Sequence, residues 1–213
     1  MTEIIPSINA PTFEEVRERI GRVEPFVSWC HLDVTDGVFS RHPTWRDPRD
    51  LAALKTSLTV EAHLMIAEPE KTIEQWLVGP VRRVIVHLEA LSAIECLTII
   101  QKCREAGKEI GLAINPETPW TAFEPWFGKV DLFLPLGVPP GASGQKPDWD
   151  TILGKIAHIR QACLSCIIEA DGGVDAETAS RARGAGANLL VAGSAIFGAA
   201  DIAEAIQELQ AGS

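Results

Sequence analysis

Eight short apolar segments alternate along this chain with segments of helical character, and this alternation constrains the fold more than any other feature. The strand candidates are Ile4–Ile8, Trp29–Val34, Leu58–Leu64, Arg83–His87, Glu109–Ile114, Leu132–Leu136, Cys166–Ala170 and Leu189–Ala192. Continuous apolar runs are typical of parallel strands that are buried on both faces. Eight strand–helix units without a midpoint linker predict a closed (β/α)8 TIM barrel of class α/β rather than a doubly wound sheet.

The helix candidates lie between the strands and are joined to them by short connections. They are Thr12–Ile20, Asp50–Leu58, Glu68–Leu77, Leu91–Ala106, Trp120–Phe127, Trp149–Ala162, Ala176–Gly184 and Asp201–Leu209. Thr12 stands three residues before Glu15, which is the spacing of a capping box at a helix start. No Pro/Ser-rich linker, charge run or low-complexity block divides the chain, so we expect a single domain over residues 1–213.

Composition excludes several classes of partner. Hydrophobic residues make up 46% of the chain, but no apolar run approaches the ~20 residues that span a bilayer. A net charge of -10 argues against nucleic acid and anionic membranes as partners. It does not argue against a small phosphorylated ligand, because such sites are local. The first residues carry no basic region followed by an apolar stretch, so we expect no signal peptide and a cytoplasmic protein.

The chain has five cysteines, an odd number at scattered spacings that fits free thiols in a reducing compartment. Cys163 and Cys166 have CxxC spacing. A zinc or redox role would require a second pair or a thioredoxin-like context, and the sequence has neither. We therefore expect both to be buried or half-buried thiols near a helix end.

Four potential metal ligands stand at or just beyond the carboxyl ends of three strands. His31 and Asp33 are two residues apart and so share a strand face, His63 ends the next strand, and Asp171 follows the seventh. Barrel enzymes carry their chemistry at this end of the strands. Two imidazoles and two carboxylates that converge there predict a divalent transition metal. His87 ends the fourth strand and is an equal candidate for direct contact or for a supporting hydrogen bond.

Glycine-rich segments follow strands six, seven and eight, at residues 139–145, 171–174 and 192–197. Glycine lets backbone N–H groups approach an anion closely, and a helix start after the eighth strand adds a positive dipole end. Barrel enzymes frequently bind phosphate after strands seven and eight. The three segments together therefore predict a phosphate site.

In these motifs the chain resembles the ribulose-phosphate 3-epimerase family, nearly from end to end. The resemblance is carried by Pro6–Ile8, His31–Gly37, His63–Ile66, His87–Ala90, Asn115–Pro119, Gly144–Lys146, Asp171–Val174 and Ala192–Phe197. The family fold is a (β/α)8 barrel. Its members form dimers to hexamers, so the resemblance also implies a homo-oligomer.

The resemblance implies one divalent metal ion (zinc, iron(II) or manganese) held by His31, Asp33, His63 and Asp171. It implies a small phosphorylated sugar as the ligand, with Ser7 and His63 among the substrate-site residues. It also implies phosphate binding by the backbone of the glycine-rich loops, namely Gly141, Ala142, Ser143, Gly144, Gly172, Gly173, Gly193 and Ser194.

The implied activity is inversion of C3 of a ketose phosphate through a 2,3-enediolate, first of all D-ribulose 5-phosphate to D-xylulose 5-phosphate. One carboxylate removes the C3 proton and a second, on the opposite face, returns a proton. Asp33 and Asp171 are the expected pair, and their roles exchange with the direction of reaction. The metal stabilises the negative charge of the enediolate. Phosphate binding far from C3 orients the sugar.

The chain departs from the family pattern at its substrate loops. Thr35 and Leu136 stand where the family carries methionine, Asn9 replaces a leucine, and the 139–143 loop differs. A hydroxyl at position 35 makes the pocket wetter or adds a hydrogen bond. The loop carries an arginine at position 41 and a histidine at position 42. These side chains either contact a longer or differently charged sugar or are solvated, and we slightly favour the second interpretation.

Three alternatives stay open. A 3-epimerase for another ketose phosphate, such as allulose 6-phosphate, has the same chemistry. The related hexulose-phosphate synthases and decarboxylases carry an Asp-x-Lys-x-x-Asp strand motif, which Thr35 interrupts here after Asp33. A phosphosugar-binding protein without turnover is disfavoured by the intact ligand set and favoured by the altered loops.

Overall fold

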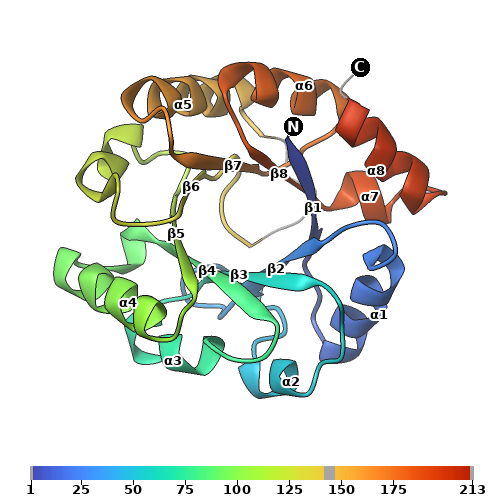
Figure 1. Cartoon of the computed structure of the whole chain (residues 1–213), viewed down its shortest axis with the longest axis horizontal. Helices are drawn as coiled ribbons and strands as arrows, with labels where there is room; N and C mark the ends of the chain where they lie inside the picture. Colours follow the sequence, from blue (N-terminus) through green and yellow to red (C-terminus); the bar gives the residue numbers. More distant parts are fainter. Residues whose placement is uncertain (1, 142–146, 212–213) are drawn as a thin grey trace.

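Eight parallel strands close into a barrel in the computed structural model, which describes residues 2–141 and 147–211. Each strand pairs with its neighbours in chain order, and β8 returns to lie beside β1 (Figure 1). The strands are β1 (Glu3–Ile8), β2 (Trp29–Thr35), β3 (Thr59–Met65), β4 (Val81–His87), β5 (Glu109–Ile114), β6 (Leu132–Pro135), β7 (Ile167–Asp171) and β8 (Leu189–Ala192). The predicted (β/α)8 barrel is confirmed.

Helices form a ring around the outside of the strands (Figure 1). The α-helices are α1 (Phe13–Val23), α2 (Pro48–Ala52), α3 (Ile73–Trp76), α4 (Ala93–Glu105), α5 (Trp149–Ala162), α6 (Ala176–Ala185), α7 (Ser194–Phe197) and α8 (Ile202–Ala211). The described residues also form three 3-10 segments, namely η1 (Pro69–Lys71), η2 (Leu88–Ala90) and η3 (Trp120–Trp126).

The helix starts follow the sequence signals, and the interruptions have local causes. Thr12 caps α1, where its side chain accepts a hydrogen bond from the backbone N–H of Glu15. The predicted helix over 120–127 is 3-10 instead, and Pro125 within it has no N–H to donate. The segment predicted as one helix over 68–77 divides into η1 and α3, with Thr72 between them in a non-helical conformation.

The structure has two apolar clusters, and the one inside the barrel fills only part of the interior, so the remaining part is polar. The larger core lies between strands and helices, whereas a smaller one fills the interior beside β4, β5 and β6. That interior cluster consists of Ile85, Ala113, Leu132, Leu134 and Leu136. Most of the buried ionisable side chains gather instead on β2, β3, β4 and β7, namely His31, Asp33, Glu61, His63, Arg83, His87 and Glu169. This asymmetry positions the candidate site.

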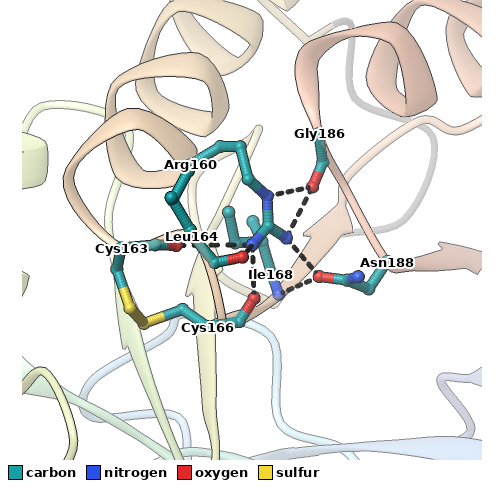
Figure 2. Close-up of a disulfide and its surroundings, with 7 residues drawn as sticks. All are labelled: Arg160, Cys163, Leu164, Cys166, Ile168, Gly186 and Asn188. Carbon is teal, nitrogen blue, oxygen red and sulfur yellow. Dashed lines mark hydrogen bonds between the residues drawn. A yellow bond between two sulfur atoms is a disulfide. The ribbon is translucent and has the colours of Figure 1, made fainter.

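The cysteine prediction is wrong for one pair and correct for the rest. Cys163 and Cys166 form a disulfide at the end of α5, while the other three cysteines are free and buried. Arg160 lies against this turn, and its guanidinium donates to the carbonyls of Cys163, Leu164 and Cys166 (Figure 2). We call these three hydrogen bonds the Arg160 clamp, and CxxC spacing alone does not reveal it.

Among the described helices, none combines the length and the apolar composition that a membrane crossing requires.

Candidate metal centre and active site

The four predicted metal ligands converge at the carboxyl end of the barrel. His31 Nε2 lies 3.3 Å from Asp33 Oδ1 and 3.9 Å from Asp171 Oδ2, and His63 Nδ1 lies 3.7 and 3.8 Å from the same two oxygens. One atom from each side chain lies within 4.8 Å of every other. Ligands about 2.0–2.2 Å from a tetrahedral ion stand about 3.3–3.6 Å apart, so this spacing fits one divalent cation.

The hydrogen-bond inventory also fits a cation. His31 Nε2 and His63 Nδ1 are buried and have no hydrogen-bond partner among the described residues. Buried ring nitrogens are normally paired, so two orphans aimed at one point indicate a missing partner. The carboxylates Asp33, Glu61 and Glu169 raise the pKa of His31 well above its ordinary value, against the effect of burial. The carboxylates therefore favour positive charge at this centre, which a cation would also supply.

Contacts outside the cluster restrain the two aspartates. Ser7 Oγ donates to Asp33 Oδ2 at 2.7 Å, which leaves Oδ1 facing the histidines. The carbonyl of Asp171 accepts from the N–H of Gly137 at 2.8 Å, and this bond fixes the end of β7 against the end of β6. Gly172, which follows, has φ +114°, a conformation that favours glycine.

The two imidazoles are each held from behind. His31 Nδ1 lies 2.8 Å from Glu61 Oε1. His63 Nε2 lies 2.9 Å from His87 Nε2, and His87 Nδ1 lies 3.3 Å from Glu89 Oε2. Metal-binding histidines commonly hydrogen-bond through the second ring nitrogen, which fixes the tautomer and the ring orientation. Of the two roles proposed for His87 from the sequence, the structure has the supporting hydrogen bond.

The two aspartates differ in proton affinity. Burial raises the pKa of Asp171 to about 7, where the charge of Asp33 adds to the increase and His31 opposes it. Burial would raise the pKa of Asp33 as well, but the imidazoles of His31 and His63 hold it well below its ordinary value. Two neighbouring carboxyls with different proton affinities are a common arrangement at sites of proton transfer.

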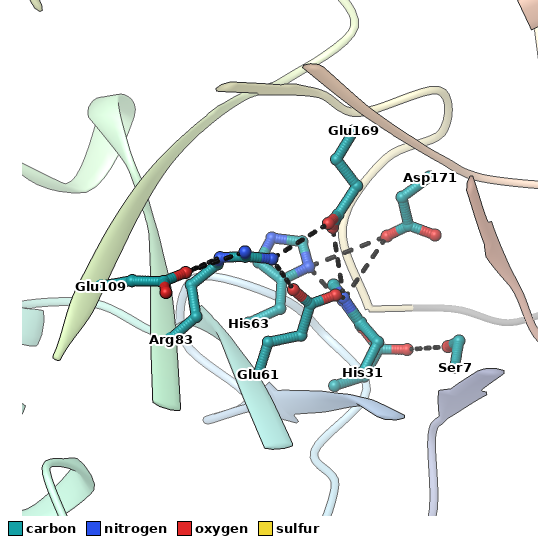
Figure 3. Close-up of polar contacts among 9 residues, drawn as sticks. Ser7, His31, Glu61, His63, Arg83, Glu109, Glu169 and Asp171 are labelled. Carbon is teal, nitrogen blue, oxygen red and sulfur yellow. Dashed lines mark hydrogen bonds and ion pairs between the residues drawn. The ribbon is translucent and has the colours of Figure 1, made fainter. Parts of the chain in front are cut away.

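A second layer of buried charge lies beneath the four ligands, and the sequence analysis missed it. Glu61 and Glu169 lie 2.8 and 3.4 Å from Nδ1 of His31, and Arg83 contacts both of these carboxylates (Figure 3). Burial raises the pKa of Glu169 to about 8, and the negative charge of Glu61 adds to the shift. A signal was available in the sequence, because Glu61 stands two residues before His63 and Glu169 two before Asp171. Residues two apart share a strand face.

A pocket opens above the ligands and contains most of the predicted substrate residues. The predicted residues that line it are Ser7, Asp33, Gly141, Asp171, Gly172, Gly173, Gly193 and Ser194. Its apolar wall consists of Met65, Leu136, Val138, Val174 and Val191. Ala142, Ser143 and Gly144, which were also predicted to bind phosphate, lie outside the described residues.

The unusual residues of the substrate loops have structural explanations. The Thr35 hydroxyl donates to the carbonyl of His42, and the residue is fully buried, so the expected extra hydrogen bond belongs to the loop and does not make the pocket wetter. Asn9 Nδ2 donates to the carbonyl of Gly141 at 3.2 Å and joins the first loop to the sixth. Arg41 and His42 are exposed, as the preferred interpretation of the sequence had them.

The family model described as the ribulose-phosphate 3 epimerase family matches residues 3–197. A chloroplastic ribulose-5-phosphate-3-epimerase of Arabidopsis thaliana is 37% identical over 98% of this chain and 76% of its own length. Ribulose-phosphate 3-epimerase of Bacillus subtilis is 36% identical over 99% of both chains.

Solved structures share the architecture at lower identity. The crystal structure of 3-hexulose-6-phosphate synthase from Salmonella typhimurium has a TM-score of 0.76 at 18% identity, over 99% of this chain and 98% of that one. An identity this low supports the fold alone. The family match and the full-length relatives support more: this chain belongs to the ribulose-phosphate 3-epimerase family and is an enzyme of the epimerase class.

Proposed function

We propose that this protein inverts C3 of D-ribulose 5-phosphate to give D-xylulose 5-phosphate through a 2,3-enediolate, as a single barrel domain over residues 1–213. The observation that supports the proposal most is the convergence of His31, Asp33, His63 and Asp171 beneath a pocket whose opposite wall is rich in glycine. The relatives named ribulose-phosphate 3-epimerase support the choice of substrate.

The four converging side chains would hold one divalent cation, for which zinc, iron(II) and manganese are the candidates. When bound, such a cation is a Lewis acid that stabilises the negative charge developing on the C2 and C3 oxygens of the sugar. Ser7 keeps one oxygen of Asp33 engaged, and this leaves the other free to face the cluster. Glu61 and His87 hold the two imidazoles in orientation.

The proton transfers are assigned to Asp33 and Asp171. They come from β2 and β7, with β1 and β8 between them, and both line the pocket. A sugar seated over Ser7 and Val191 would therefore have one carboxylate on each side of C3. One of them removes the C3 proton and the other delivers a proton to the opposite face, so that the centre inverts.

The sugar phosphate is assigned to the glycine-lined wall of the pocket. Gly172 and Gly173 have φ of +114° and +68°, a backbone conformation that residues with a side chain rarely adopt. Gly193 and Ser194 follow β8 on the neighbouring loop. Binding the phosphate there fixes the position of C3 and contributes orientation rather than chemistry.

A second ketose phosphate is the main alternative to ribulose 5-phosphate. Leu136 lies in the pocket wall where the family pattern has methionine, and the shorter side chain alters the space around the sugar chain. The test loads the protein with zinc, iron(II) or manganese and measures proton–deuterium exchange at C3 in D2O. NMR detects the exchange for the phosphates of ribulose, xylulose and allulose. Exchange with the pentulose phosphates supports the proposal. Exchange with allulose 6-phosphate alone reassigns the substrate, and exchange with none favours a binding protein.

A homo-oligomer and a cytoplasmic location stay predictions from the resemblance and the composition. Light scattering on the purified protein gives its oligomeric state, and fractionation of the source cells gives its location.

A further inference from the structure

A row of charged side chains crosses four neighbouring strands at the metal ligands, and the proposed function gives no role to the two members beyond Glu61. The strand register pairs His31 of β2 with Glu61 of β3, Glu61 with Arg83 of β4, and Arg83 with Glu109 of β5. Basic and acidic groups therefore alternate along one line of cross-strand neighbours. The row begins at a proposed ligand and ends at a partly exposed glutamate.

The contacts along this row are short and continuous (Figure 3). His31 Nδ1 lies 2.8 Å from Glu61 Oε1, and Glu61 Oε2 accepts from Arg83 Nη1 at 2.7 Å. Arg83 Nη2 and Nε donate to Glu109 Oε2 at 2.9 and 3.1 Å. The guanidinium also lies over the ring of Trp29, 4.7 Å from its centroid. Glu61 thus uses each of its oxygens for a different partner.

Burial makes this arrangement costly unless it is complete. Glu61 has no exposed surface, and Arg83 is only 5% exposed. A second fully buried carboxyl, Glu169, lies 3.4 Å from His31 Nδ1 and 4.0 Å from Arg83 Nη1. A buried carboxylate that lost its counter-charge would be strongly disfavoured. Arg83 therefore joins His31 in favouring the ionised form of Glu61 beside another acid.

An ionised acceptor at His31 Nδ1 has a direct consequence at the other ring nitrogen. It holds the hydrogen on Nδ1, presents the lone pair of Nε2 to the ligand cluster, and makes that nitrogen a stronger donor to a metal. Charge-assisted hydrogen bonds also orient a ring more tightly than neutral ones.

We propose that Glu61 and Arg83 are a positioning pair, in which Arg83 holds Glu61 and Glu61 holds His31 for the divalent cation. The pair acts through His31 and does not touch the sugar. The inference rests on the proposed metal-dependent function, and it adds two residues that the four-ligand set does not include.

The test compares zinc affinity in three variants, measured by competition with a chromophoric chelator. Glu61→Gln keeps an acceptor of nearly the same shape but removes its charge. Glu61→Gln/Arg83→Met removes both charges, so that neither member of the pair is left buried without the other. Arg82→Met is the matched control, because Arg82 is the adjacent residue of β4, is exposed, and donates to the same Glu109.

We expect both Glu61 variants to bind zinc about 10- to 100-fold more weakly than the wild type, with the control unchanged. The cobalt(II) absorption spectrum should change in the same two variants. Thermal melting in excess chelator should be closer to that of the wild type for the double variant than for Glu61→Gln, which separates positioning of the ligand from support of the fold. Wild-type zinc affinity in either Glu61 variant would overturn the proposal.

The outcome is independent of the substrate assignment. If the wild type exchanges the C3 proton of none of the sugars, the proposed function fails, while weaker zinc binding by the variants still supports the positioning pair. If C3 exchange occurs but zinc affinity is equal in all the proteins, only the positioning role fails.

Discussion

His63 Nε2 lies 2.9 Å from Nε2 of His87, so one of the two nitrogens carries the hydrogen and the other accepts it. His63 Nδ1 faces the ligand cluster and requires its lone pair for a metal, which places the hydrogen of His63 on Nε2. His87 is then the acceptor, and its own Nδ1–H donates to Glu89 Oε2 at 3.3 Å. The chain from Glu89 through His87 thus determines the tautomer of a proposed ligand.

Replacing His87 should weaken metal binding without unfolding the barrel. His87→Leu removes the acceptor for His63 Nε2–H and fills similar apolar space, so zinc affinity should fall about tenfold. Chelator competition measures the change. His158→Gln is the control, because His158 is exposed on α5, stacks on Trp120 and is not among the proposed ligands or their hydrogen-bond partners. Unchanged affinity in His87→Leu would mean that the imidazole of His63 is oriented without His87.

Asp171→Asn should abolish C3 exchange while the fold persists. The amide is nearly isosteric but cannot accept the proton, so we expect a loss of about 10²–10⁴-fold in exchange rate. NMR in D2O measures the rate, and circular dichroism checks the fold. Asp150→Asn is a matched control on an exposed residue that pairs with Arg181. Full exchange activity in Asp171→Asn would refute the assigned role.

Removal of metal by a chelator should end C3 exchange and lower the melting temperature. The two aspartates and two histidines converge on one point, where a cation would bind all four. A ligand at about 100 times its dissociation constant stabilises the native state by about 2.7 kcal/mol. Calorimetry with and without chelator measures this difference, and readdition of zinc, iron(II) or manganese identifies the active ion by recovered exchange. Equal melting temperatures would contradict the metal site.

Glu89 should make stability depend on pH in the acid range. Burial opposes ionisation of Glu89, but hydrogen bonds from His87, Thr118 and the N–H of Asn115 lower its pKa to about 2 from an ordinary 4.5. The folded protein therefore binds this proton less readily than the unfolded chain. The resulting stabilisation is fully present above pH about 4.5 and is lost as the pH falls toward about 2.

Glu89→Gln tests this dependence. After allowance for the partial exposure of the side chain, we expect the variant to be about 1–2 kcal/mol less stable than the wild type at pH 7. The two unfolding free energies should converge near pH 2. Urea unfolding of both proteins in chelator, at a series of pH values, measures the difference. A gap that does not change with pH would show that the carboxylate charge is not its source.

The Arg160 clamp should contribute more to stability than the disulfide it supports. Cys163 and Cys166 are separated by only 3 positions, and chain-entropy arguments give about 2 kcal/mol for so short a ring. Arg160 donates to the carbonyls of Leu164 and Cys166, just before β7, and to that of Gly186, which follows α6. We expect Arg160→Met to lower the free energy of unfolding by about 3 kcal/mol. Urea unfolding compares it with Cys163→Ser/Cys166→Ser, and a larger loss in the double serine variant would reverse the order.

The sequence by itself determined the barrel and the positions of its proposed ligands. Both depend on local periodicity: apolar runs alternate with helical segments, and His31 and Asp33 share a face because side chains alternate along a strand. Parallel strands with short connections then bring all the carboxyl ends to one edge, where these ligands meet. The same periodicity could have pointed to Glu61, two residues before His63.

Only the tertiary structure decided what each buried group touches. The contact of Glu61 with Arg83, the bond of Thr35 to the carbonyl of His42, and the joining of Cys163 to Cys166 depend on strand register and loop path. A residue's type and spacing do not specify these, because register follows from packing of the whole sheet and loops follow from contacts distant in sequence. Local periodicity therefore determines which face of a strand each side chain lies on, and the closed barrel determines which other residues it contacts.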